Sequence, residues 1–97
     1  DNSSISASIS IEKGNKSQLN SKLKELGIDS DDIIELNELI DVEAPDLEKK
    51  KLGNKTVDWI SKVSGKALKG VGNITKEVTS SILAHIIMQY FGIPPLH

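Results

Sequence analysis

The side chains best suited to acid–base chemistry lie in the first half of the chain. Four carboxylates recur there at helical spacing: Asp31, Asp32, Glu35 and Glu38. Residues three or four apart share one side of a helix, where two carboxylates could act as a general acid and a general base. The same spacing is typical of a solvated helix face, and no serine stands in a nucleophile motif. We therefore expect a charged surface here and predict no catalytic residue.

Metal-binding and phosphate-binding patterns are also missing from the sequence. His85 is the only internal histidine, and it lacks further ligands at the spacing that a zinc site requires. Residues 29–35 lack the central glycine of a calcium-binding loop. Gly65, Gly70 and Gly72 are not followed by the lysine and hydroxyl residue of a phosphate-binding loop. The prediction is a protein without metal or cofactor that is not an enzyme.

Composition limits the chain to one small domain. With 97 residues, of which 37% are hydrophobic, it can build only a thin core, and such chains often self-associate. A net charge of −2 argues against a nucleic-acid partner. The absence of cysteine excludes disulfides, and no apolar run approaches the roughly 20 residues of a membrane span. These features predict a soluble, cytoplasmic protein, and the missing initial methionine suggests a piece of a longer one.

The charges are unevenly distributed along the chain. Acidic residues dominate positions 29–46, and lysines dominate positions 49–76. The simplest interpretation is two solvated faces that attract each other within one molecule. Head-to-tail attraction between subunits and contact with an anionic surface are the alternatives.

Local signals predict a series of helices. The first runs over residues 17–26 and ends at Gly27, and the second begins at residues 29–32 and ends before Pro45. Residues 46–51 are expected to form one more helical turn. Asn54 is expected to cap a helix over residues 56–69.

The last helix is expected to begin at residue 73 or 75 and to end at residue 91. Gly92 and the two prolines after it stop that helix. Gly70 and Gly72 could form a break before it, or they could allow close packing within one continuous helix. The sequence leaves both interpretations open.

A long apolar stripe is the strongest pattern in the chain. Its members recur at helical spacing between residues 58 and 93: Trp59, Ile60, Val63, Ala67, Leu68, Val71, Ile74, Val78, Ile82, Leu83, Ile86, Ile87, Tyr90 and Phe91. Such a stripe has to be buried, either in the chain's own core or against a partner. Five residues are the predicted core or interaction positions: Trp59, Ile82, Ile86, Tyr90 and Phe91.

The N-terminal segment has a different period. Ile5, Ala7, Ile9 and Ile11 alternate with polar residues, which is the pattern of a half-buried strand. No second alternating run follows, so this strand must pair with another copy, pair with another part of a parent protein, or stay disordered. We divide the chain into an arm, residues 1–16, and a helical domain, residues 17–97.

Four short segments resemble a known family. They are GIDSDDIIEL at residues 27–36, KLGNK at 51–55, VDWISK at 57–62 and YFG at 90–92. Over residues 27–93 the chain resembles the C-terminal region of AbiTii-like bacterial abortive-infection proteins, which act in phage defence. The resemblance implies an intracellular bacterial protein with a role in the response to phage. It transfers no catalytic residue to this chain.

Together these patterns predict a mostly α fold with one N-terminal strand paired between chains. The predicted function is a non-enzymatic protein–protein interaction or oligomerisation module, which forms a homo-oligomer or binds the rest of a parent protein. The alternative is a membrane-active effector. In that case residues 74–93 would lie in a bilayer interface, with lysines facing anionic headgroups.

Overall fold

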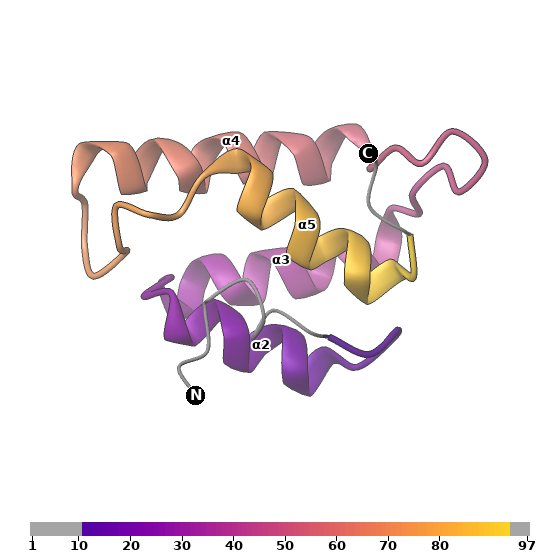
Figure 1. Ribbon diagram of the computed structural model, residues 1–97, viewed down its shortest axis with the longest axis horizontal. Coiled ribbons are helices and arrows are strands. Elements are labelled where there is room, and N and C mark those ends of the chain that lie inside the picture. The colour runs from indigo at the N-terminus through magenta and orange to yellow at the C-terminus, as the bar shows by residue number, and fades with distance from the viewer. Residues whose placement is uncertain (1–10, 94–97) are drawn as a thin grey trace, which may run out of the picture.

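The computed structural model describes residues 11–93, and within that range the chain forms four helices. They are α2 (Lys16–Glu25), α3 (Ser30–Val42), α4 (Asn54–Lys69) and α5 (Ser80–Phe91). Figure 1 shows α4 and α2 on opposite sides of the molecule, with α3 and α5 between them. Each helix packs against two others, because α3 and α5 both contact α2 and α4. The predicted, mostly helical fold is confirmed.

Most helix ends lie where local signals place them. The Asn15 side chain accepts a hydrogen bond from the Gln18 N–H at 3.0 Å and caps α2. Gly27, Gly70 and Gly92 all have positive φ, and each follows a helix. Gly70 ends α4, so the chain breaks here and does not continue as one helix. This is the first of the two interpretations that the sequence left open.

Two segments differ from the prediction. Residues 46–51 form a turn closed by paired bonds, from the Asp46 N–H to the Lys51 carbonyl at 2.8 Å and back at 3.0 Å. The last helix begins at Ser80, because the segment before it is fixed to the turn after α2. There the Thr75 N–H donates to the Leu26 carbonyl at 3.1 Å. These tertiary bonds replace the helical bonds that the sequence favoured.

The core is aliphatic and lies between the four helices. Several side chains have no exposed surface: Leu19, Leu23, Leu36, Val63, Leu83, Ile86 and Ile87. Trp59 and Ile86 are buried as predicted, while Ile82, Tyr90 and Phe91 are partly buried and pack against this core. Leu68 is 83% exposed and Val71 is also exposed, so neither lies in the chain's own core, which was the first of the two places predicted for the stripe. α4 ends one residue after Leu68, and in its last turn Ala67 is the side chain that faces the core.

The predicted N-terminal strand lies almost wholly outside the described residues, which begin at Ile11. Within residues 11–93 no strand forms. Ile11 is buried in the core of its own chain, and its N–H donates to the Gln89 side-chain carbonyl at 2.7 Å. Its assignment as a strand-pairing residue is therefore not supported. No helix in this part of the chain has the length and apolar content to cross a bilayer.

Candidate functional site

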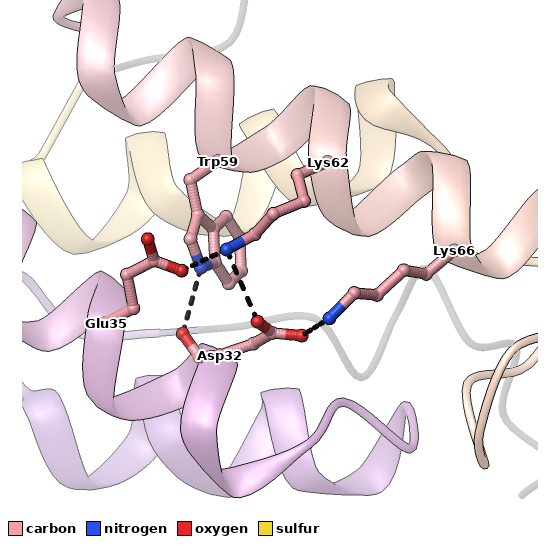
Figure 2. Close-up of polar contacts among 5 residues, drawn as sticks. All are labelled: Asp32, Glu35, Trp59, Lys62 and Lys66. Carbon is pink, nitrogen blue, oxygen red and sulfur yellow. Dashed lines mark hydrogen bonds and ion pairs between the residues drawn. The ribbon is translucent and has the colours of Figure 1, made fainter.

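A cluster of charged side chains joins α3 to α4 around Trp59 (Figure 2). The Asp32 carboxylate accepts a hydrogen bond from the Lys66 ammonium at 2.6 Å and lies 3.5 Å from that of Lys62. Lys62 also binds the Glu35 carboxylate. The Trp59 indole N–H donates to the Asp32 backbone carbonyl at 2.9 Å. The cluster thus holds the first turn of α3 against the middle of α4.

The chemistry of this cluster is structural. Asp32 is only 5% exposed, so its assignment to a solvated face was wrong. Two ammonium groups balance its charge, as a buried carboxylate requires. The hydrogen bond to Glu35 raises the pKa of Lys62 above its ordinary value of 10.5, and Asp32 adds to the effect. The Lys62 amine therefore stays protonated, which makes it unsuited to act as a nucleophile or base.

A small cavity of about 270 Å³ lies beside this cluster. It is lined by Glu35, Leu39, Lys55, Asp58, Trp59 and Lys62. Charges of both signs surround it, and among the described residues no buried side-chain N or O atom lacks a hydrogen-bond partner. Within residues 11–93, no buried side-chain polar atom is therefore left without a partner that a small ligand could supply.

Glu43 caps the N-terminus of α4 from a distant position in the chain. Its carboxylate accepts hydrogen bonds from the N–H groups of Lys55 at 3.0 Å and Thr56 at 2.9 Å, and from the Thr56 hydroxyl at 3.0 Å. A Cβ at Gly53 would stand 2.3 Å from the Glu43 side chain, so the carboxylate needs the glycine beside it. The predicted cap, Asn54, is instead the first residue of the helix, and its side chain makes no cap.

The cap also sets the ionisation of Glu43. Loss of solvent raises its pKa, but the hydrogen bonds from Lys55 and Thr56, with the Lys55 charge, outweigh that effect. The net result is a pKa below the ordinary 4.5. Because Glu43 stands 13 residues before Thr56, no local signal in the sequence could have identified it.

A second and larger hollow lies where α4 meets α5. This α4/α5 groove has a volume of about 460 Å³ and is lined by Lys50, Lys51, Leu52, Asn54, Val57, Ile60, Ser61, Ser80, Ala84 and Met88. Small residues of both helices leave it open, and Val57 at its edge is 46% exposed. Next to it, the Ser64 and Ser80 hydroxyls are 3.0 Å apart and tie the two helices together.

Two lysines, Lys50 and Lys51, line this groove, and Lys49 comes directly before them in the sequence. We call Lys49, Lys50 and Lys51 the lysine turn, and within residues 11–93 none of them forms an ion pair. The Lys49 N–H donates to the Asp46 carboxylate at 3.1 Å, which fixes the turn. Lys50 has a φ of 56°, in the left-handed region that disfavours a residue with a side chain. Strained positions of this kind cluster at functional sites.

The predicted interaction residues of α5 are not the residues that line the groove. On α5, Ile82, Ile86 and Tyr90 belong to the core or pack against it, whereas Ser80, Ala84 and Met88 line the groove, and Ala84 also contacts the core. That second face repeats every four residues, a spacing visible in the sequence but hidden by the stronger apolar stripe. His85 is half-buried, and no group of metal-binding side chains forms in the described part of the chain.

Comparison of the chain with known protein families, characterised proteins and solved structures found no match. The function is therefore inferred from the groove and the charges around it.

Proposed function

We propose that this chain is a non-enzymatic association module whose contact surface is the α4/α5 groove and whose occupant is a second copy of the chain. One observation carries the proposal. An open, largely apolar hollow of about 460 Å³ ends at lysines that have no ion pair within residues 11–93. Apolar surface gains about 25 cal/mol for each Å² removed from water, and unpaired charges at its rim select the partner.

Charge complementarity supports a second copy as the occupant. The groove presents lysines, while the same chain carries an excess of exposed acidic residues on α3. A module of this kind would set the oligomeric state of a protein attached to it. The resemblance to abortive-infection proteins suggests phage defence as the setting, and that setting is part of the proposal.

The membrane-active alternative has less support. Leu83, Ile86 and Ile87 are three of the four large aliphatic residues of α5, and all three have no exposed surface. A helix has to offer its apolar face to enter a bilayer interface, so α5 would first have to leave the core. Co-sedimentation with anionic vesicles at moderate salt would favour the alternative.

Sedimentation equilibrium tests the proposal on the full chain, from about 5 µM to about 1 mM, a range that detects weak self-association. We expect the average mass to rise with concentration. Val57→Arg places a bulky charge at the exposed edge of the groove and should weaken association at least about tenfold. Leu68→Arg is the matched control, because Leu68 lies on the same helix, is exposed and does not line the groove.

Two results would overturn the proposal. One is a wild-type chain that stays monomeric at every concentration. The other is a Val57→Arg chain that associates as strongly as the Leu68→Arg control. Circular dichroism of both variants would establish that each remains folded.

A further inference from the structure

We infer that the α4/α5 groove of one copy receives the outer face of α3 from the next copy, in a head-to-tail contact. The inference rests on the proposed function and specifies the second surface. Two surfaces of the same molecule support it. They carry opposite charges, and their residues have the same spacing along a helix.

The outer face of α3 combines acidic and aliphatic side chains. We call Asp31, Ile34, Glu38 and Val42 the acidic stripe. These residues lie on one side of the helix, since they are spaced by three or four residues. Ile34 is 57% exposed and Val42 is 77% exposed, so both aliphatic side chains are available for contact with a second copy. Neither Asp31 nor Glu38 forms an ion pair within residues 11–93.

The stripe matches the groove in length and in charge. Ile34 and Val42 are eight residues apart, which is about 12 Å along a helix at about 1.5 Å per residue. Ser80 and Met88 line the groove and are also eight residues apart on α5. Two aliphatic side chains could therefore enter the groove at its two ends. Glu38 would lie between them, four residues before Val42, where the long side chains of Lys50 and Lys51 could reach its carboxylate from the end of the groove.

Each copy can use both surfaces at the same time. No residue of α3 lines the groove, so the stripe and the groove are separate parts of the molecule. A contact between two different surfaces is heterologous, and it produces a closed ring or an open chain of copies. A symmetric contact through one shared surface would stop at a dimer.

Charge reversal tests this pairing in the full chain. We expect Glu38→Lys and Lys51→Glu each to weaken self-association at least about tenfold. Glu77→Lys is the control, because Glu77 is exposed and lies outside both surfaces. Raising the salt concentration from about 50 mM to about 500 mM should weaken wild-type association, since exposed charges are then screened.

Mixing the two variants gives the sharpest result. An equimolar mixture of the Glu38→Lys and Lys51→Glu proteins contains the wild-type pair of surfaces and also the charge-reversed pair. We therefore expect mixed assemblies in which the two proteins alternate, and much weaker association of each protein alone. The double variant Glu38→Lys/Lys51→Glu reverses both surfaces and should recover much of the wild-type association.

The outcomes separate the inference from the proposed function. If Val57→Arg abolishes association but Glu38→Lys leaves it unchanged, the groove binds something other than the stripe and the inference fails alone. A mixture that forms no assembly containing both variants also overturns the inference. A wild-type chain that never associates overturns both.

Discussion

Asp32 has neighbours that differ sharply from those of Asp31, although the two stand side by side in the first turn of α3. Asp32 is buried between Lys62 and Lys66, whereas Asp31 is exposed. Both lie near the helix N-terminus and gain similarly from the helix dipole. A difference in the free energy of unfolding between variants of these two residues therefore measures what the cluster between α3 and α4 contributes.

We predict that Asp32→Ala lowers the free energy of unfolding by about 1–3 kcal/mol, because it leaves two ammonium groups without their shared carboxylate. The loss stays below that of a fully buried pair, since the Lys62 and Lys66 side chains are 43% and 31% exposed and can regain water. Urea unfolding at low protein concentration measures it. Asp31→Ala is the control, and an equal loss in both variants would contradict a stabilising role for the cluster.

Glu43 should make the stability of the protein depend on pH. Its pKa is lowered on folding, so its ionised form contributes stability above pH 4.5, and that contribution disappears as the pH falls through the lowered value. We predict that Glu43→Gln is less stable than wild type at pH 7 by about 1 kcal/mol, the typical value of a helix cap. The difference should shrink below pH 4.5.

Thermal unfolding measured between pH 7 and pH 3 shows how the stability difference between wild type and Glu43→Gln changes with pH. Glu48→Gln serves as the control, because Glu48 is exposed and accepts none of the bonds that cap α4. A gap between wild type and Glu43→Gln that stays constant with pH would rule out the carboxylate as the source.

At the scale of elements, the turn after α2 and the segment before α5 depend on each other. Gly27 has a φ of 85°, and a Cβ there would stand 2.0 Å from the Asn73 carbonyl oxygen. This close approach lets the Thr75 N–H reach the Leu26 carbonyl. The contact is the reason that residues 73–79 are not helical.

We predict that Gly27→Ala lowers the free energy of unfolding by more than about 2 kcal/mol. Left-handed strain alone costs about 1–2 kcal/mol, and the clash with the Asn73 backbone adds to it. Gly65→Ala is the matched control inside α4. A Cβ there meets nothing within 4 Å, so helix propensity should raise stability by about 0.5–1 kcal/mol. Denaturant unfolding that shows equal effects for both substitutions would refute the packing argument.

Helices follow the sequence more closely than the segments between them do. Gly27, Gly70 and Gly92 end helices at predicted positions because a positive φ is a local requirement. The turn at 46–51 and the first residue of α5 were predicted wrongly, since backbone bonds to other residues decide both. The candidate site was missed for the same reason. Its lining comes from α4, α5 and the turn before α4, which no periodicity within one segment connects.

At the scale of the whole molecule, the four helices of residues 11–93 form a closed cycle of contacts around one aliphatic core. This arrangement buries most of the apolar stripe of residues 58–93 in the chain's own core. Most of the stripe is therefore not available as the predicted interaction surface. Among residues 11–93, the large hydrophobic side chains that remain exposed lie on α3, on α4 and in the segments beside α4: Ile34, Val42, Leu47, Val57, Leu68 and Val71. The surface available for self-association therefore differs from the predicted one.

The role of the N-terminal segment can be separated from that of the groove. We predict that removing residues 1–10 leaves self-association unchanged, because the groove and the acidic stripe both lie within residues 11–93. Removing residues 1–12 also deletes the buried Ile11, and should lower stability by at least about 2 kcal/mol. Sedimentation and urea unfolding measure the two effects. A fall in mass on removing residues 1–10 would instead support strand pairing between copies.

The sequence by itself determined that the chain is small, helical and free of recognisable catalytic or metal-binding patterns, and it located the helices and most of their ends. Those properties depend on residues within one or two helical turns, which interact whatever the rest of the chain does. Only the tertiary structure decided that Asp32 is buried beside Lys66, that Glu43 caps α4, and that a groove opens between α4 and α5. Asp32 and Lys66 are 34 residues apart, and contacts over such separations depend on how the helices pack.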